Sequence, residues 1–595
     1  MKNLKLLSGF IKGNRLVFFG AMASVCLAAL FSTVLPLVTK TIIDSIIGSK
    51  PMELPEFLLN IVKAIGGREV LVKNIWICGL IIISITAFNG FFLFLKGRLA
   101  AVASENAGKK LRERVFDHIM HLPVESLSKF NTGDMIQRCT SDIETVQGFV
   151  SGQLVEVGQI LLTFALVIAV MLTIDPLYTL VSVTLIPFIL IATVLFFNGM
   201  KVVFKETDES EGALSAMLQE NLTGVRVVKA FGAQGLEADA FDGKNKAYRD
   251  NVYRIIKLMS NFWSSTDFFC LFQFAAVLLT GVYWINSGRI SLGTMVAFTI
   301  YSGMLIWPVR QLGQIIAFMG QSFVSLNRIQ EILSCEVEAT GLDETRPDLT
   351  GSIEFKEVEF GYNEETPILK DLSFKIGKGQ TAAFLGPTGS GKSSIAHLLI
   401  RLYDYQKGSV TIDGNEVKCI ERKWLRNHIG IVLQEPFLFT KSIKENILYG
   451  KPGAQEEDIY CSCEIAAVHN TIQEFEKGYH TIVGERGVTL SGGQRQRVAI
   501  ARAVIRDVPI LIFDDSLSAV DMETDEAIRK ALKKRSADTT TIIISHRITT
   551  LAEADIIFVL DEGRIVQQGT HEELINQEGL YKRVWELQGS VESEA

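Results

Sequence analysis

Six long apolar runs in the first half of the chain constrain its fold more than any other feature. Each is uncharged and close to or above the length of about 20 residues that crosses a bilayer as a helix. Helices suit this role because lipid offers no partners for backbone N–H and C=O groups. The runs therefore predict six membrane-spanning helices with both chain ends on one side. They lie at Leu16–Val38, Ile75–Leu95, Val157–Ile174, Leu177–Met200, Phe268–Ile285 and Leu292–Trp307, the last continuing toward Phe318 with an interruption at Arg310.

The charged residues between these runs predict an orientation. The long segments after the second and fourth runs carry far more Lys and Arg than the outward connections, so the positive-inside rule places them and both termini in the cytosol. Asp175 and Pro176 form nearly the whole connection between runs three and four, which predicts an extracellular hairpin. Each long loop is rich in helix formers and should be a hairpin of prolonged spans, with short transverse helices at 122–130 and 222–231.

Composition changes near the middle of the chain. Residues 334–350 are rich in Glu, Thr, Asp and Pro, as in a linker, so we expect a transmembrane domain at 1–333, an α/β domain at 351–588 and a tail at 589–595. A net charge of −7 argues against nucleic acid as the main partner. Eight cysteines without a CxxC pair favour reduced thiols over a disulfide scaffold. Residues 3–11 have apolar side chains at helical spacing and are either an inner-leaflet helix or an ordinary basic flank.

A loop typical of phosphate binding begins the second half. It follows the strand-like Thr381–Leu385 and precedes a helical run, Ser394–Leu402. In the pattern G-x-x-x-x-G-K-[ST], successive backbone N–H groups and a helix N-terminus surround an anion. Lys392 is expected to neutralise phosphate charge and the Ser393 hydroxyl to bind Mg²⁺. The matching residues are Gly386, Pro387, Thr388, Gly389, Ser390, Gly391, Lys392 and Ser393.

A second acidic motif fits the same chemistry. The apolar run Ile510–Phe513 reads as a buried parallel strand and is followed by Asp514 and Asp515. An acid at the carboxyl end of such a strand lies at the crevice where these sheets bind ligands. Asp514 is the expected Mg²⁺ partner, and the alternative, a helix-capping aspartate, is weaker beside the phosphate loop.

The stretch Leu490–Arg497, which reads LSGGQRQR, resembles the signature of ATP-binding cassette (ABC) transporters. From end to end the chain resembles an ABC exporter half-transporter of the bacterial multidrug and lipid-exporter type: an α-helical membrane domain, then an α/β P-loop cassette. The resemblance implies that Tyr362 stacks on adenine, that Gln434 touches Mg²⁺ and the attacking water, and that His546 meets the γ-phosphate. It also places 122–130 and 222–231 as coupling helices, and Thr481–Gly487 as a loop that meets them. Further nucleotide contacts are implied at Ser394, Ser491, Gly492, Gly493, Gln494 and Asp521.

The signature also has a physical interpretation. Ser491, Gly492 and Gly493 precede a helix expected from Gln494 onward, which makes a second helix N-terminus suited to phosphate. One nucleotide already has its loop at 386–393, so this turn is expected to serve another nucleotide. In the family it faces the ATP of the opposing cassette. A dimer with a second half-transporter is therefore expected.

One residue departs from the family pattern. Where the family usually has Glu, as the group that orients or deprotonates the attacking water, this chain has Asp515. Asp is shorter by one methylene, and a misplacement of about 1 Å can cost about 10²-fold in rate. Two alternatives remain open: a heterodimer in which this chain holds the weakened site and lends its signature to a competent partner, or a homodimer with slow hydrolysis by Asp515.

The resemblance implies ATP-driven export of a hydrophobic or amphipathic substrate across the cytoplasmic membrane, with ATP and Mg²⁺ bound by a cytosolic cassette. An ATP-gated channel or a sensor is the alternative from another class. Polar residues in or beside the last two spans are candidates for contact with substrate or water. Asp267 and Arg310 also fit the membrane boundary, whereas Gln273 lies within span five.

Overall fold

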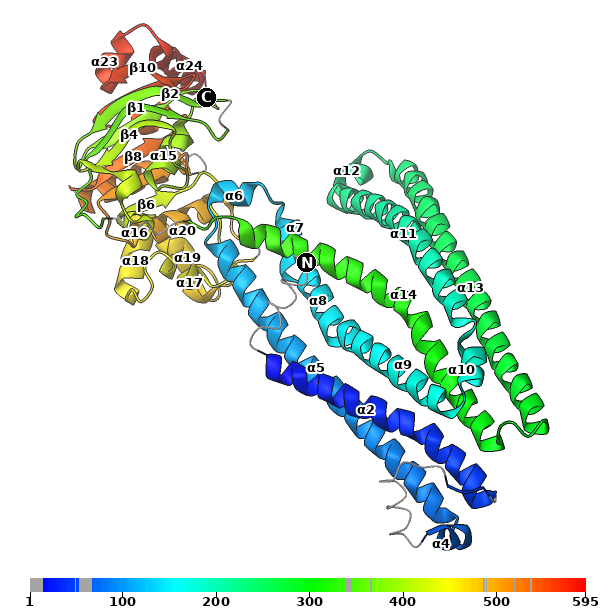
Figure 1. Ribbon diagram of the computed structural model, residues 1–595. Coiled ribbons are helices and arrows are strands. Elements are labelled where there is room, and N and C mark those ends of the chain that lie inside the picture. Colours follow the sequence, from blue (N-terminus) through cyan, green and yellow to red (C-terminus); the bar gives the residue numbers. More distant parts are fainter. Residues whose placement is uncertain are drawn as a thin grey trace. The chain divides into compact units, whose positions relative to one another are not determined.

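The computed structural model describes residues 14–48, 50–52, 67–338, 345–363, 366–484, 487, 489–517, 520–535 and 538–594 (Figure 1). Its contacts divide the chain into two compact units, treated separately here. The membrane unit comprises Met1–Met120 and Phe130–Cys335, and the α/β unit comprises His121–Lys129 and Glu336–Ala595. The helix considered for residues 3–11 lies outside the described residues.

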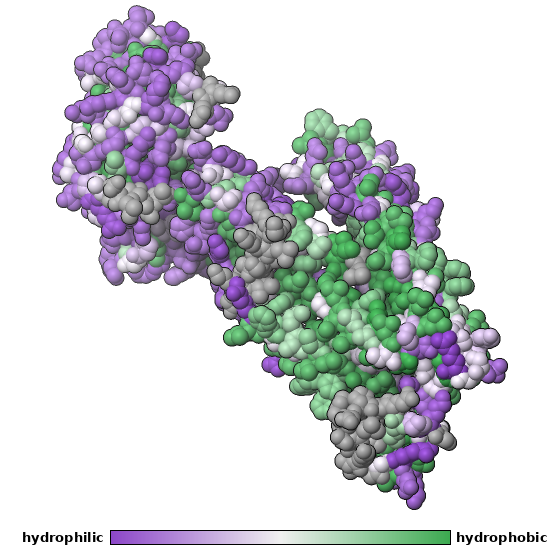
Figure 2. Space-filling view, viewed as in Figure 1, coloured by the Kyte–Doolittle hydropathy of each residue, from purple (hydrophilic) through white to green (hydrophobic). Residues whose placement is uncertain are grey.

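The membrane unit contains six helical segments long and apolar enough to cross a bilayer among the described residues, which confirms the predicted spans. Figure 2 shows apolar residues covering much of the surface of these helices, whereas the α/β unit is mostly hydrophilic outside. The exposed apolar surface is expected of helices that face lipid. The segments are Arg15–Ile47, Trp76–Met120, Thr132–Ile174, Pro176–Thr223, Gln234–Asn286 and Leu292–Gln311.

Several of these helices are far longer than a membrane is thick. Helix α5 has 45 residues and α13 has 53, so at about 1.5 Å per residue α13 is about 80 Å long. The hydrocarbon core is only about 30 Å thick, so the spans continue well beyond it, as the composition of the long loops predicts. The elements of the unit are α2 (Arg15–Thr41), η1 (Ile42–Ile47), α4 (Gly67–Lys73), α5 (Trp76–Met120), α7 (Thr132–Cys139), α8 (Ser141–Gly148), η2 (Phe149–Gln153), α9 (Leu154–Ile174), α10 (Pro176–Val183), α11 (Ile186–Thr223), α12 (Val225–Ala230), α13 (Gln234–Asn286) and α14 (Leu292–Ser334).

The fourth span is interrupted, and the interruption explains one buried polar residue. Helix α10 ends at Val183 and α11 begins at Ile186. Gln273, fully buried on α13, donates to the Val181 carbonyl at 2.7 Å and accepts from the Leu185 N–H at 3.1 Å. The expectation that Gln273 faces substrate or water is therefore wrong. Its amide satisfies backbone groups that the break leaves without helical partners, as membrane helices require.

Two sheets form the centre of the α/β unit. One has four antiparallel strands in the order β2-β1-β4-β5, and the other has six in the order β10-β9-β3-β8-β7-β6, parallel except for β10. Phe374 of the first sheet packs against Phe384 and Phe558 of the second, so an aromatic core joins them. The strands are β1 (Ile353–Phe360), β2 (Leu369–Ile376), β3 (Thr381–Leu385), β4 (Lys407–Ile412), β5 (Asn415–Glu416), β6 (Ile429–Val432), β7 (Ile510–Asp514), β8 (Thr540–Ile544), β9 (Ile556–Asp561) and β10 (Arg564–Gly569).

Helices surround the larger sheet. The expected helix after the phosphate loop begins at Lys392 and ends at Leu399, somewhat earlier at both ends than predicted. The last helix continues to Glu594, through the residues expected to form a tail. The helices are α6 (Val124–Ser128), α15 (Lys392–Leu399), η3 (Val417–Cys419), α16 (Arg422–His428), α17 (Ile443–Leu448), α18 (Glu456–Ile465), α19 (His469–Gln473), η4 (Gly478–His480), α20 (Gly492–Val504), α21 (Met522–Arg535), α22 (Ile548–Leu551), α23 (His571–Asn576) and α24 (Leu580–Glu594).

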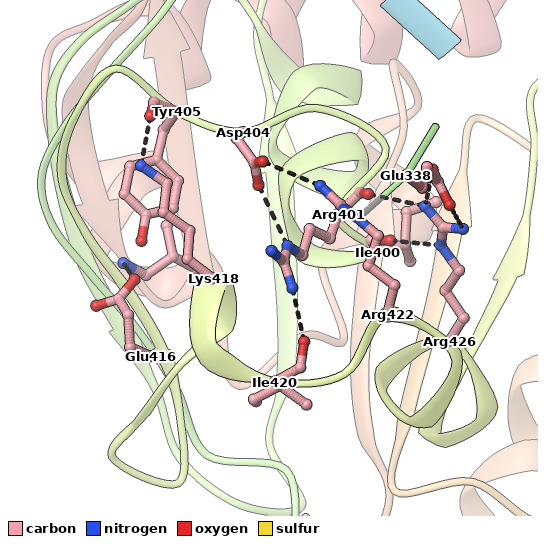
Figure 3. Close-up of polar contacts among 11 residues, drawn as sticks. Glu338, Ile400, Arg401, Asp404, Tyr405, Glu416, Lys418, Ile420, Arg422 and Arg426 are labelled. Atoms are coloured by element: carbon pink, nitrogen blue, oxygen red, sulfur yellow. Dashed lines mark hydrogen bonds and ion pairs between the residues drawn. The ribbon is translucent and has the colours of Figure 1, made fainter. Parts of the chain in front are cut away.

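The short helix α6 groups with the α/β unit, although the sequence places it in the membrane domain. The Glu338 N–H donates to the His121 carbonyl at 2.8 Å. Figure 3 shows the Glu338 carboxylate facing Arg426 of α16, which donates to both of its oxygens at 2.9 and 2.8 Å. A bidentate pair of this kind fixes geometry as well as charge. The tip of the first long loop, the linker and α16 are thus joined.

We expect Asp413 to stabilise the entry of the chain into β1. Its carboxylate accepts from the N–H groups of Gly351 and Ser352 at 3.0 Å each, and from Thr350. Burial alone would raise the pKa of Asp413, but these three backbone donors outweigh it, so its pKa lies below the ordinary value. The stability it contributes is present above its unfolded pKa of about 3.9 and is lost as pH falls through the lower folded pKa.

Asp413→Asn should therefore destabilise the α/β unit by about 1–3 kcal/mol at neutral pH. Thermal unfolding of the full chain measures this effect, with Asp371→Asn as the matched control, because Asp371 is exposed and lies 4.0 Å from Arg564, which is exposed as well. The difference in stability between wild type and Asp413→Asn should become smaller only in acid, below about pH 4. An equal gap at all pH values would contradict the role of the charge.

Candidate functional site

Three neighbouring parallel strands end at the same edge of the larger sheet and bring the sequence motifs together. The order is β3-β8-β7. The phosphate loop follows β3, His546 follows β8, and Asp514 ends β7. The Asp515 N–H donates to the Ile544 carbonyl at 2.8 Å, which ties the ends of β7 and β8. Ligands of such sheets bind at this edge.

The loop Gly386–Ser393 has backbone conformations and contacts that require its glycines. Gly391, the N-cap of α15, has a φ of +97° and Gly389 a φ of +86°, in the left-handed region where glycine is favoured. A Cβ atom on Gly386 would lie 2.2 Å from the Leu560 carbonyl oxygen. Inside the loop, Lys392 Nζ donates to the carbonyls of Gly386 and Pro387 at 2.8 Å each. The lysine is therefore held within the turn that its own backbone forms.

Burial leaves two charged groups of this site poorly compensated. Lys392 is 6% exposed, and burial lowers its pKa although the carboxylates of Asp515 and Asp514 oppose the shift. Asp514 is 3% exposed, and burial raises its pKa against the Ser393 hydroxyl, which donates to it at 2.9 Å. An Mg²⁺-nucleotide would bring phosphate charge to the lysine and a cation to the hydroxyl and carboxylate. The residues present therefore fit both ATP and Mg²⁺.

Two of the expected catalytic residues lie near each other. Gln434 Nε2 donates to Asp515 Oδ2 at 3.5 Å, a long hydrogen bond. Asp515 has a φ of +45°, which is uncommon for a residue other than glycine. The strained backbone directs successive side chains differently, so Asp514 meets Ser393 while Asp515 meets Gln434.

Tyr362 lies in an aromatic cluster over helix α15. Its ring meets Tyr403 edge-on at 4.8 Å, and it stays 38% exposed. Its hydroxyl is 2.9 Å from His397 Nδ1 and 3.2 Å from Ser394 Oγ. Sequence reasoning missed Tyr403 and His397, because neither belongs to a recognisable motif. Burial first, then Tyr362 and the Glu125 carboxylate of α6, raise the pKa of Tyr403, so α6 lies close to this cluster.

His546 has an exposed side chain, and its backbone is held by a residue that the sequence did not indicate. Gln588 of α24 donates to the His546 carbonyl at 2.7 Å and accepts from the Ile548 N–H at 2.9 Å. Arg547 donates to the Val520 carbonyl at 3.1 Å, which connects this loop to the segment before α21. No spacing rule connects Gln588 to His546, since they lie 42 positions apart.

The signature turn forms a capped helix start. Helix α20 begins at Gly492, two residues earlier than expected, because Ser491 and Gln494 form a capping box. The Gln494 N–H donates to Ser491 Oγ at 3.2 Å, and the Ser491 N–H donates to Gln494 Oε1 at 2.9 Å. The amides of Gly492 and Gly493 come first in the helix, where N–H groups have no intrahelical acceptor. A Cβ atom on Gly492 would meet nothing within 4 Å, so this turn faces open space.

Asp521 accepts from the Thr524 N–H at 2.9 Å and so caps the start of α21. Ser518 and Ala519, three and two positions before it, lie outside the described residues, as do Glu485 and Arg486 of the loop at 481–487. The structure thus assembles the phosphate loop, Asp514, Asp515 and Gln434 at one edge. The side-chain hydrogen bonds of the signature turn join two of its own residues, Ser491 and Gln494.

Two family models match the chain. Residues 16–309 match the ABC transporter transmembrane region, and residues 369–518 match the ABC transporter model. The chain is 33% identical to an uncharacterized ABC transporter ATP-binding protein, YknU of Bacillus subtilis, over 99% of this chain and 98% of that protein. It is 34% identical to YgaD of the same organism, a putative multidrug export ATP-binding/permease protein, over 80% of this chain and 83% of that one.

A solved structure is similar over nearly the whole length. A bacterial Atm1-family ABC exporter with ATP bound superimposes with a TM-score of 0.80 at 26% sequence identity. The match covers 97% of this chain and 99% of that chain. It includes both the six-helix region and the α/β region, in the same order along the chain.

Proposed function

The chain belongs to the ABC transporter family, with its membrane region and its ATP-binding region in one polypeptide, and we propose that it works as one half of a dimeric exporter. Its fold is that of the ABC exporters, and its enzymatic activity is ATP hydrolysis coupled to transport. The observation that carries the dimer is the split nucleotide site. The phosphate loop and its carboxylates lie at one sheet edge, whereas the signature turn is capped on itself and faces open space.

The second coupling helix supports the same proposal. Helix α12 and its flanks leave Leu222, Val227 and Phe231 exposed by 66%, 60% and 83%. Large apolar side chains gathered at one loop tip indicate a contact surface. By contrast, α6 belongs to the chain's own α/β unit. We propose that α6 couples to the chain's own cassette and that α12 contacts the partner's cassette.

At its own nucleotide site the chain positions ATP and the attacking water and compensates the charge of the phosphates. Lys392 and the N–H groups of Gly389–Ser393 hold the β- and γ-phosphates of ATP, and the Tyr362 ring covers adenine. When bound by Ser393, Asp514 and Gln434, Mg²⁺ would neutralise charge that develops on the transferred phosphoryl group. Asp515 and Gln434 orient the attacking water, and Asp515 is placed to accept its proton. His546 is the candidate for contact with the γ-phosphate.

We further propose a heterodimer in which this chain holds the weaker of two sites. Asp515 has the charge of the usual glutamate but a shorter reach, while the signature turn is fully formed. This chain would then hold ATP with little turnover and lend Ser491–Gln494 to a competent partner. The Lys- and Arg-rich long loops support insertion in the cytoplasmic membrane with the cassette in the cytosol. The wide apolar surface of the spans is compatible with a hydrophobic or amphipathic substrate.

The ATPase of the purified chain, alone and with a partner half-transporter, tests the heterodimer. We expect little hydrolysis from the chain alone and substantial hydrolysis from the pair. Substantial activity of the chain alone that is lost on Asp515→Asn would leave the homodimer as the correct assembly. Absence of hydrolysis in every combination, with ATP still bound, would contradict ATP-driven export itself.

A further inference from the structure

A buried arginine lies within the membrane unit, near the inner end of the last two spans. Arg310 is 18 positions into α14, which begins at Leu292, so it lies about 27 Å from that end at about 1.5 Å per residue. Asp267 lies at a matching depth before the end of α13 at Asn286. Both are thus close to the inner boundary of a hydrocarbon core of about 30 Å. Charged residues at this depth are costly and commonly mark a functional site.

The two residues form an asymmetric ion pair. Arg310 Nη1 donates to Asp267 Oδ1 at 2.6 Å, but the arginine side chain is 4% exposed while that of the aspartate is 57% exposed. The guanidinium carbon also lies 4.4 Å from the ring centre of Trp263 and 5.3 Å from that of Trp307. Both indoles are about half exposed. A cation held between aromatic rings is stabilised without losing its charge.

The contacts of the guanidinium group leave one edge without an anionic partner. Nε and Nη2 are buried and have no hydrogen-bond partner within the described part of the chain. Those two nitrogens form the edge whose parallel N–H groups match the two oxygens of a carboxylate or phosphate. The Cys270 thiol interacts with the guanidinium group, but a neutral thiol is only a weak acceptor and supplies no negative charge. Buried donors left in this state are unfavourable unless another ligand satisfies them.

Resting on the export function above, we propose that this edge of Arg310 binds the phosphate or carboxylate group of an amphipathic transport substrate. The exposed indoles of Trp263 and Trp307 contact its apolar part. Asp267 holds the guanidinium by Nη1 and leaves the Nε and Nη2 edge for the ligand. Because that edge is covered in the described conformation, access requires movement of the indoles, which the relative motion of α13 and α14 during transport would provide. Anionic amphiphiles should therefore be preferred over neutral ones.

Tryptophan fluorescence tests this preference without ATP turnover. The nucleotide-free assembly, in phosphatidylcholine nanodiscs, is titrated with terminally brominated undecanoate or with the matching brominated alcohol, since bromine quenches nearby indoles. We expect the acid to bind at least about tenfold more tightly than the alcohol. Arg310→Gln should weaken binding of the acid by about 10- to 100-fold, the range for a lost hydrogen bond to a charged group, and leave the alcohol unchanged. Trp307→Phe should reduce the quenching amplitude, which identifies the site.

Two further variants keep the test decisive if Arg310→Gln does not fold. Arg310→Lys keeps the charge but not the two-donor edge, so it should bind the acid with intermediate affinity. Asp267→Asn removes a negative charge that repels a nearby anion, so this variant should bind the acid more tightly. Nanodiscs that contain brominated phosphatidylglycerol distinguish the source of the anion: quenching by this lipid, relieved by undecanoate, indicates a bilayer headgroup, and quenching by the free acid alone indicates a soluble amphiphile.

Equal affinity for acid and alcohol, or acid binding unaffected by Arg310→Gln and Asp267→Asn, would overturn the proposal. That result would leave export intact, because ATPase and transport by the same assembly are measured separately. Export itself fails if the assembly does not hydrolyse ATP, or if hydrolysis is not coupled to the movement of any compound.

Discussion

Replacing Asp515 by glutamate should raise ATP turnover at this chain's own nucleotide site by about 10²-fold, which corresponds to about 2.7 kcal/mol of activation free energy. The physical reason is reach. Asp515 lies directly after the buried Asp514 at the end of β7, and its carboxylate lies 3.5 Å from Gln434 Nε2. One more methylene extends the reach of the same charge by about 1.5 Å. Single-turnover hydrolysis by the purified assembly measures the gain.

The control for this prediction is Asp515→Asn, which keeps the size of the side chain but removes the base. We expect it to lower the residual hydrolysis at this site and to leave ATP binding unchanged. If Asp515→Glu leaves the rate unchanged, the reach of this carboxylate does not limit hydrolysis, and the case for a weakened site is lost. The backbone at Asp515 is left-handed, with a φ of +45°, a conformation that asparagine tolerates as well as aspartate does and glutamate less well.

Substitution of the signature serine, Ser491, should lower the ATPase rate of the assembly more than substitution of the chain's own phosphate-binding lysine, Lys392. In the proposed heterodimer Ser491 completes the competent site, so Ser491→Arg should lower steady-state ATPase by about 10²-fold or more, as expected when an electrostatic clamp on the transition state is removed. Lys392→Ala affects the site that turns over slowly and should lower the rate by less than about tenfold. In a homodimer each of the two substitutions is present at every nucleotide site, so both should lower the ATPase rate to a similar extent.

A second capped helix provides the matched control for Ser491. Thr570 caps α23 with the same kind of capping box, and its hydroxyl accepts from the Glu573 N–H. Thr570→Arg thus loses a comparable cap, worth about 1 kcal/mol, without touching the signature. We expect it to lower the thermal midpoint as Ser491→Arg does and to leave ATPase unchanged. Loss of ATPase in both variants would instead indicate general destabilisation.

Local sequence pattern was sufficient to predict the membrane spans and the strand that precedes the phosphate loop. The six spans were predictable because apolar length is a strong signal, and β3 has the predicted bounds because its apolar run lies directly before a glycine-rich turn. The start of α20 was predicted two residues late. There a reciprocal pair of side-chain hydrogen bonds between Ser491 and Gln494 recruits both glycines into the helix.

The contacts that the sequence pattern did not predict join residues that are distant in sequence. Gln273 appeared to be a polar residue available to substrate, but it satisfies the broken backbone near Leu185, 88 positions away. Gln588, Tyr403 and His397 have no motif, and only folding brings them to His546 and Tyr362. Asp267 and Arg310 were each visible as charges near a membrane boundary. Their pairing, and the unmatched edge that it leaves, required the packing of two helices.

The length of α13 has a mechanical consequence. A continuous helix of 53 residues is a stiff rod of about 80 Å, so a tilt of about 5° about its Asn286 end displaces its opposite tip by about 7 Å. The same tilt moves Asp267, about 28 Å from that pivot, by only about 2 Å. Leverage of this kind converts a large displacement at the Gln234 end of α13 into a small displacement at Asp267, large enough to break or make one hydrogen bond.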